Sequence, residues 1–201
     1  MGIAIETWVI VLIKDFGTAK QRLEPALAPS ARQALARRNA KLAVGAAAAG
    51  DHVLVVAGGD QVAQVVRAWG AEALVEPRQE GQNVAARRGI ERAVEGGAGA
   101  VLLLSSDLPL VSYESVRDLL RFAATGMDPV VIAVPAIGRG GTNALYLRPP
   151  GVVGLHFGDD SLTKFQEDAE GKGVDFLIHR SDAMALDLDE PSDLARLRSA
   201  V

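Results

Sequence analysis

The chain has 201 residues, of which 49% are hydrophobic and 23% are charged; its formal net charge is −4 and it contains no cysteine. This composition is typical of a globular protein, and the length suits one domain covering residues 1–201. The slightly acidic balance gives no general attraction for nucleic acid or an anionic membrane. The absence of cysteine excludes disulfides, thiolate metal sites and a catalytic thiol.

The first segment, MGIAIETWVIVLIKDF, has no basic leader, and its apolar run is too short to span a bilayer. We therefore expect a first strand at residues 7–13 and a cytoplasmic protein. The sequence leaves a homodimer open.

Short apolar runs alternate with longer segments rich in Ala, Leu, Arg and Glu. We predict buried strands at residues 7–13, 53–57, 73–75, 101–104 and 130–134. Helices are predicted at residues 30–49, 60–69, 83–95 and 112–124, the last with Ser112 as its N-cap. Repeated strand–helix–strand order favours right-handed crossovers and a doubly wound α/β sheet.

After residue 135 this rhythm changes. The glycine-rich IGRGGT (residues 137–142) leads into a predicted strand at 143–147, which suggests an antiparallel excursion at the sheet edge. GDDS (158–161) opens a helix candidate, and the strand-like ALDLD (185–189) precedes a helix start at Pro191. The predicted fold is a three-layer, Rossmann-like α/β fold with a mostly parallel mixed sheet.

Two familiar site patterns are absent. The glycine loop leads into a strand, whereas a dinucleotide fingerprint needs a helix at that point. Thr142 and Ser161 have no basic partner nearby in the sequence, so a nucleophilic triad has no support.

Acidic residues follow two predicted strands. Asp107 comes just after residues 101–104, at the strand end where open α/β sheets bind ligands. Asp187 and Asp189 alternate, so both could face one side of an extended chain. These oxygen ligands favour Mg²⁺ held together with substrate phosphates. The alternatives are that Asp107 caps the helix near Ser112, and that Asp187 or Asp189 caps the helix at Pro191.

Histidine gives no support for zinc, because His52, His156 and His179 are scattered along the chain.

A basic loop follows the first strand. KDFGTAKQRL places Lys14, Lys20 and Arg22 around Gly17, a composition suited to a triphosphate. The spacing is not that of a P-loop, and lone basic loops are often solvated surface.

A second anion site is predicted at Gly158 and Ser161. Free N–H groups at a helix N-terminus, together with the Ser161 hydroxyl, would bind a small acid carrying phosphate and carboxylate. The alternative is that Ser161 is only an N-cap.

Taken together, these motifs resemble one family. The chain contains K…G-x-A-K-x-R-L, G-x-N-x-A, D-L-P, G-T-N-A-L, F-G-x-x-S and D-x-D-x-P-x-D-L between about residues 7 and 194. This set resembles the phospholactate/phosphoenolpyruvate guanylyltransferases, which make the guanylylated precursor of the deazaflavin coenzyme F-420. One position departs from the family: its F-G-x-x-S-x-x-R-H pattern has histidine where this chain has Phe165.

The resemblance implies a nucleotidyltransferase fold and a Mg²⁺-dependent transfer of GMP from GTP to a small phosphorylated carboxylic acid. It assigns Lys14, Gly17, Lys20, Arg22 and Asn83 to the nucleotide, with Asn83 at the guanosine. It assigns catalysis to Asp107, Lys20 and Arg22, the metal to Asp107 with Asp187 or Asp189, and the acceptor to Thr142, Gly158 and Ser161.

Two other functions stay open. One is a nucleotidyltransferase of the same fold acting on a molybdopterin or a sugar phosphate. The other is a nucleotide-binding protein without catalysis, against which the three aspartates argue. Phosphoenolpyruvate, 2-phospholactate and 3-phosphoglycerate are not distinguished as acceptors.

Overall fold

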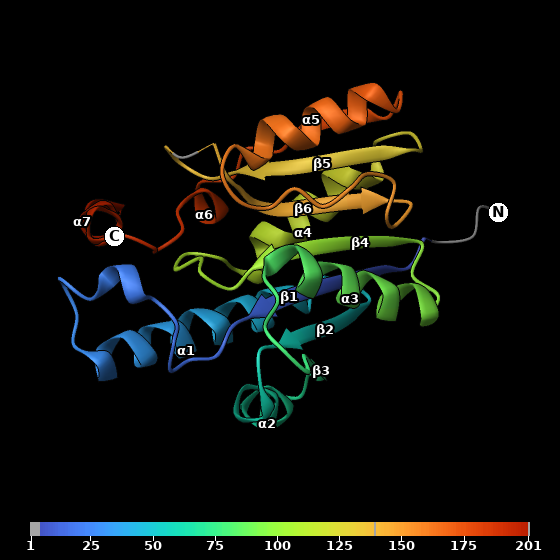
Figure 1. Cartoon of the computed structure of the whole chain (residues 1–201). Coiled ribbons are helices and arrows are strands. Elements are labelled where there is room, and N and C mark those ends of the chain that lie inside the picture. Colours follow the sequence, from blue (N-terminus) through green and yellow to red (C-terminus); the bar gives the residue numbers. More distant parts are fainter. Residues whose placement is uncertain (1–4, 139, 201) are drawn as a thin grey trace.

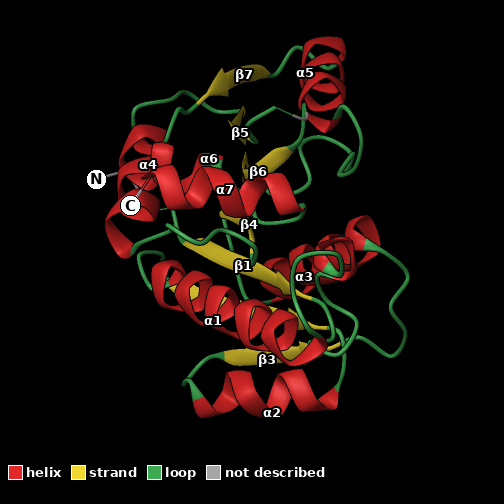
Figure 2. Ribbon diagram, turned by 90° about the vertical axis from the view of Figure 1, so that its left-hand side faces the viewer, coloured by secondary structure: helices red, strands yellow, loops and turns green. Residues whose placement is uncertain are grey.

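The computed structural model describes residues 5–138 and 140–200 of the chain. Within these residues a single seven-stranded sheet has the order β3-β2-β1-β4-β6-β5-β7, with β1 to β6 labelled in Figure 1 and β7 in Figure 2. The strands are β1 Thr7–Ile13, β2 His52–Ala57, β3 Glu72–Val75, β4 Ala100–Ser105, β5 Val130–Pro135, β6 Thr142–Arg148 and β7 Asp175–Ile178. β6 is antiparallel to both of its neighbours, and the other pairings are parallel.

Helices cover both faces of this sheet (Figure 2). The helices are α1 Pro29–Ala47, α2 Asp60–Ala68, α3 Gln82–Glu95, α4 Tyr113–Ala124, α5 Ser161–Gly171, α6 Asp182–Ala185 and α7 Pro191–Ala200, with a 3₁₀ turn η1 at Gln21–Leu23. One buried apolar cluster joins α1, α2, α4 and α6 to the sheet. A second cluster joins α3 and α5 to the opposite face. The predicted three-layer α/β fold with a mostly parallel mixed sheet is confirmed.

The strand order reverses at β1. The chain moves outward from β1 to β2 and β3, and then returns through α3 to place β4 on the other side of β1. In open α/β sheets a ligand binds at such a reversal, beyond the carboxyl ends of the strands. The loops after β1 and β4 carry Lys20 and Asp107, so the topology brings these two residues to one place.

Helix α4 begins as predicted at Ser112. The Ser112 hydroxyl accepts a hydrogen bond from the Ser115 N–H at 3.2 Å, and the Ser112 N–H donates to the Ser115 hydroxyl at 3.0 Å. This reciprocal cap satisfies the first turn. Asp107 is therefore not the cap of α4, and the structural alternative for that residue is wrong.

The C-terminal third differs from the prediction in two respects. The expected antiparallel strand, β6, lies between β4 and β5 rather than at the sheet edge. The edge strand on this side of the sheet is β7, which pairs with β5 and was not predicted from the sequence. Local alternation cannot reveal this order, because β6 is buried along its whole length and resembles its parallel neighbours.

The strand-like run at residues 185–189 also differs. Ala185 ends α6, and the following residues belong to no strand of the described chain. Their alternation is nevertheless present, since Leu186 and Leu188 are buried while Asp187 and Asp189 are partly exposed. One hydrogen bond, from the Leu188 N–H to the Asp107 carbonyl at 3.0 Å, holds this extended segment beside the β4–α4 loop.

None of the helices in the described part of the chain combines the length and the apolar character that crossing a membrane requires.

Candidate active site

A cleft of about 520 Å³ lies at the carboxyl ends of the strands. Its walls come from the loops after β1, β3, β4 and β5, the start of β6, and the segment before α7. Most of the predicted site residues line it: Lys14, Lys20, Arg22, Asp107, Thr142, Gly158, Ser161, Asp187 and Asp189. Of the described residues that were predicted for the site, Gly17 and Asn83 do not line the cleft.

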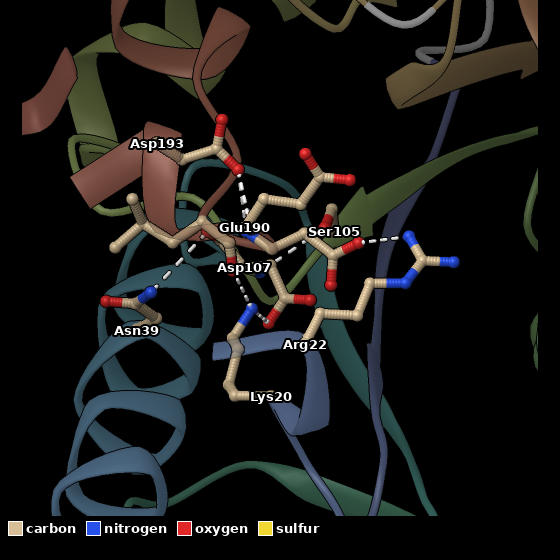
Figure 3. Close-up of polar contacts among 9 residues, drawn as sticks. Lys20, Arg22, Asn39, Ser105, Asp107, Glu190 and Asp193 are labelled. Atoms are coloured by element: carbon tan, nitrogen blue, oxygen red, sulfur yellow. Dashed lines mark hydrogen bonds and ion pairs between the residues drawn. The ribbon is translucent and has the colours of Figure 1, made fainter. Parts of the chain in front are cut away.

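Lys20 is the central residue of the charged end of the cleft (Figure 3). Its Nζ lies 2.6 Å from Asp107 Oδ1 and donates to the Leu188 carbonyl at 2.5 Å. The Lys20 side chain is only 2% exposed, whereas the Asp107 side chain is 42% exposed. One lysine thus links the β1 loop, the β4 loop and the segment before α7, and leaves part of the Asp107 carboxylate open to the cleft.

The loop after β1 has an unusual backbone conformation at Lys20 and a hydrogen-bonded turn at Asp15. Lys20 has φ 61° and ψ 32°, in the left-handed region that non-glycine residues rarely occupy. Asp15 Oδ1 accepts hydrogen bonds from the Gly17 N–H at 2.7 Å and the Thr18 N–H at 3.3 Å. A Cβ at Gly17 would come within 2.9 Å of Asp15 Oδ1. Gly17 therefore has a structural part in this turn, while Lys14 lies exposed at the cleft wall.

A second ion pair joins Arg22 to Asp189, with 2.7 Å between Nη1 and Oδ2. Behind it, Asp193 Oδ2 accepts hydrogen bonds from the N–H groups of Asp189 at 3.0 Å and Glu190 at 2.8 Å (Figure 3). Asp193 is 1% exposed and fixes the entry into α7. It stands in the D-x-D-x-P-x-D-L motif, but sequence reasoning gave it no role.

The donor set fits a hard divalent cation only in combination with a phosphate ligand. Among the described residues no three His, Cys, Asp or Glu side chains form a preassembled metal site. Asp107, Asp187 and Asp189 nevertheless line the same cleft, and all their donors are oxygens. Mg²⁺ commonly takes one or two protein carboxylates and completes its shell with water and substrate phosphates.

The opposite end of the cleft, here called the hydroxyl end, is formed by Thr142, Gly158 and Ser161, and the exposed Asp159 is an acidic residue in its lining. The Ser161 hydroxyl donates to the Thr142 hydroxyl at 3.1 Å, and both residues are buried. Ser161 is the first residue of α5; the N-cap position belongs to Asp160, whose side chain forms no capping hydrogen bond. The alternative in which Ser161 is simply an N-cap is therefore wrong.

The backbone of the turn into α5 is uncrowded at Gly158. Gly158 has φ 128°, a conformation that favours glycine, and an added Cβ there would meet nothing within 4 Å. Asp160 also has a positive φ, of 52°. The turn therefore brings backbone N–H groups and the Ser161 hydroxyl to this end of the cleft, beside the exposed carboxylates of Asp159 and Asp160. The Ser161 N–H itself donates to the Gly158 carbonyl at 3.3 Å.

Asn83 contacts the backbone of the loop before α5. Its Nδ2 donates to the Phe157 carbonyl at 3.1 Å, and its Oδ1 accepts from the Phe157 N–H at 2.8 Å. This two-way contact fixes the backbone directly before Gly158. Asn83 thus supports the hydroxyl end of the cleft without lining it, and its contact with guanosine stays a prediction.

The same loop is anchored from α5. Asp168 Oδ2 accepts from the Gly154 N–H at 2.6 Å and contacts His156 Nε2 at 2.9 Å. The His156 hydrogen bond is the main cause that lowers the pKa of Asp168 to about 2, with further contributions from Gly154 and Lys172.

Phe165 stands where the family pattern has histidine. It is fully buried, and its ring contacts those of His156 and Phe157 at centroid distances of 5.4 and 5.2 Å. Phe165 therefore places an apolar ring under the loop before α5, where the family pattern has a titratable one.

Asn143, part of the G-T-N-A-L motif, has a structural role that the sequence did not predict. Its Nδ2 donates to the carbonyls of Met184 at 2.8 Å and Ala185 at 3.0 Å. It therefore ties β6 to α6 and to the segment that carries Asp187.

Comparison with known proteins agrees with this arrangement. Residues 7–198 match the family described as "Guanylyl transferase CofC like". The chain belongs to this family. It is an enzyme of the nucleotidyltransferase class, as predicted.

Two relatives cover nearly the whole chain. A phosphoenolpyruvate guanylyltransferase of Rubrobacter xylanophilus is 38% identical over 200 residues, 98% of this chain and 95% of that protein. A 2-phospho-L-lactate guanylyltransferase of Methanothermobacter thermautotrophicus is 33% identical, over 96% of this chain and 84% of that protein.

Among solved structures, a putative nucleotide-diphospho-sugar transferase from Desulfovibrio desulfuricans G20 superimposes with a TM-score of 0.74. It is 21% identical and covers 96% of this chain and 86% of its own, which supports the fold alone.

Proposed function

We propose that the protein is a Mg²⁺-dependent guanylyltransferase that transfers GMP from GTP to a small phosphorylated carboxylic acid and releases pyrophosphate. The observation that carries this proposal is a cleft with two unlike ends. Lysine, arginine and aspartate side chains gather at one end, and the Thr142–Ser161 hydroxyl pair with Gly158 forms the other.

The proposed reaction is one displacement at phosphorus. An oxygen of the acceptor phosphate attacks the α-phosphorus of GTP, a new P–O bond forms, and the bond to the β-phosphate oxygen breaks with departure of pyrophosphate. A phosphate oxygen is already ionised at neutral pH, so the step needs no general base. Catalysis then depends on positioning the reactants and neutralising their charge.

We assign triphosphate binding, metal binding and acceptor orientation to three different groups of residues. Lys14, Lys20 and Arg22 are proposed to bind the triphosphate, since their cationic groups line the charged end of the cleft. Asp107, with Asp187 or Asp189, would hold Mg²⁺, which when bound would supply charge neutralisation for the phosphates. Thr142, Gly158 and Ser161 are proposed to orient the acceptor.

The proposed acceptor class is supported by the donor groups at the hydroxyl end of the cleft and by the names of the relatives. The hydroxyls and N–H groups there are donors for a small anion, and the two relatives bear the names of a phosphoenolpyruvate and a 2-phospho-L-lactate enzyme. We propose one of these two acids as the acceptor. The guanylylated product would serve the biosynthesis of coenzyme F-420, as the family resemblance implies.

Two successive experiments, the first on nucleotide binding and the second on turnover, test this proposal. We expect GTP to raise the melting temperature and Mg²⁺ to increase that rise, because a ligand that binds the folded state stabilises it by mass action. Pyrophosphate release should then require GTP, Mg²⁺ and the acceptor together. Release with GTP and a sugar phosphate, but with neither phospho-acid, would contradict the proposed acceptor class.

A further inference from the structure

Glu76 occupies a defined place on the carboxyl edge of the sheet. Its N–H donates to the Ala57 carbonyl at 2.9 Å, just as the Gly58 N–H donates to the Ile13 carbonyl at 2.8 Å. The strand registers pair Ile13 with Ala57 and Ala57 with Val75. Lys14, Gly58 and Glu76 therefore follow one another along the edge. Glu76 lies two strands from Lys14, about 10 Å at the usual strand spacing.

The space between Glu76 and the charged end has an apolar floor and a polar rim. Leu12, Val56 and Ala85 line it on the side covered by α3. Gln79 closes the rim by donating from Nε2 to the Gly58 carbonyl at 2.7 Å. Gly58 adds no side chain to this space. A slot with apolar walls and few polar groups at its end suits a planar base.

The Glu76 carboxylate is buried but retains unused acceptor capacity. Its side chain is 7% exposed and lies 3.1 Å from Arg88 Nη1. Burial raises the pKa of Glu76, and the Arg88 charge opposes that rise. A carboxylate has about four lone-pair sites, so the Arg88 contact leaves room for further N–H donors. Among the described residues Arg88 is its hydrogen-bond partner.

We propose that Glu76 is the residue that selects guanine, by accepting hydrogen bonds from the N1–H and the exocyclic amino group of the base. The inference rests on the proposed use of GTP and names the recognition element within that same cleft. Adenine and cytosine present a ring-nitrogen acceptor where guanine presents N1–H, so a carboxylate at this point disfavours both. Uracil has a suitable N–H but is too small to span the slot in the same way.

The position of Glu76 also agrees with the contacts of Asn83, the residue that the family resemblance assigned to guanosine. One N–H and one lone pair of the Asn83 amide bond the Phe157 backbone, which holds this side chain toward that loop. Glu76 lines the cleft and Asn83 does not.

Binding of GTP, ITP and ATP, each with Mg²⁺, to the full chain by isothermal titration calorimetry tests the proposal. ITP keeps N1–H and lacks the amino group, so the unmodified protein should bind GTP most tightly, ITP more weakly and ATP weakest. In Glu76→Gln the affinity for GTP should fall by about tenfold to a hundredfold, the range for a charge-assisted hydrogen bond. The affinity for ATP should hold or rise, because the new amide can donate to its N1.

Glu80→Gln is the matched control. Glu80 also pairs with Arg88, but its side chain is 52% exposed and it does not line the cleft. This variant should keep the wild-type order and affinities. The comparison of GTP with ITP needs no variant, so it stays informative if Glu76→Gln folds poorly.

The outcomes separate this inference from the proposed function. A wild-type preference for GTP that Glu76→Gln retains in full would overturn the assignment of Glu76 and leave guanylyl transfer intact. Equal affinity for GTP and ITP in the unmodified protein would likewise overturn the amino-group contact. Tighter binding of ATP than of GTP by the unmodified protein would overturn both the inference and the proposed nucleotide.

Discussion

The two ends of the cleft are built in contrasting ways. At the parallel half of the sheet, ion pairs such as Lys20–Asp107 and Arg22–Asp189 join segments far apart in the sequence. At the half that contains the antiparallel β6, two buried hydroxyls bond each other and no ion pair joins them. We propose that the first end binds a highly charged triphosphate and its cation. For the second end we propose a smaller anion, bound by hydroxyl and backbone N–H groups beside the acidic Asp159.

We propose that this contrast lets one cleft bind two anions at separate sites. Cations at both ends would attract the triphosphate to either, whereas an end with hydroxyls and an acidic residue disfavours it. Substitutions at the charged end should therefore affect turnover and GTP binding. Substitutions at the hydroxyl end should affect the phospho-acid and leave GTP nearly unchanged.

Asp107→Asn should give the largest effect. We expect turnover to fall at least a hundredfold in saturating Mg²⁺, since a lost metal-bound charge removes several kcal/mol of transition-state stabilisation. Steady-state pyrophosphate release measures this. Asp118→Asn, an exposed change on α4, is the control and should have wild-type activity. Full turnover by Asp107→Asn would show that the charged end does not hold the metal through this residue.

Lys20→Ala should raise the Michaelis constant for GTP by about tenfold to a hundredfold, corresponding to about 1.5–3 kcal/mol for a lost charge-assisted hydrogen bond. Its melting temperature should also fall, because the Leu188 carbonyl loses a buried donor. Lys41→Ala, exposed on α1, is the control. An unchanged Michaelis constant for GTP would place Lys20 in a purely structural role.

Ser161→Ala should raise the Michaelis constant for the phospho-acid several-fold and leave that for GTP almost unchanged. Thr163 is exposed in the same first turn of α5, so Thr163→Ala should alter neither constant. A fall in melting temperature with both constants preserved would show that the bond between the Ser161 and Thr142 hydroxyls serves only packing.

Asn83→Ala should give the smallest kinetic effect of the four variants. By releasing the Phe157 backbone it should raise the Michaelis constant for the phospho-acid a few-fold, more than that for GTP. Gln166→Ala, an exposed change on α5, is the control. An effect confined to GTP would instead support the predicted contact of Asn83 with guanosine and contradict its role at the hydroxyl end.

Much of this arrangement could be predicted from the sequence. The continuous apolar runs locate the parallel strands, and residues placed just after them, such as Asp107, lie on the binding edge by topology. The helix start at Ser112 could also be predicted, because a serine cap is a local sequence signal. These features depend on a few neighbouring residues or on a general rule of open sheets.

Other features depend on contacts between distant segments. Periodicity cannot distinguish β6 as an interior strand, and it cannot show that Asn83 bonds Phe157 across 74 positions. Glu76 belongs to no recognisable motif, since single glutamates after short strands are common. Only the order of the strands shows that it lies on the cleft. Asp193 was visible in its motif, but its role as an acceptor for the N–H groups before α7 required the three-dimensional structure.

The central claim is that the cleft joins GTP to a small phospho-acid, and mass spectrometry of the products tests it most directly. The protein should be incubated with GTP, Mg²⁺ and, separately, phosphoenolpyruvate, 2-phospho-L-lactate and 3-phosphoglycerate. The account predicts a guanylylated product and equimolar pyrophosphate with phosphoenolpyruvate or 2-phospho-L-lactate, and neither product when Mg²⁺ is omitted. Absence of a guanylylated product with all three acids, while GTP is shown to bind, would contradict it.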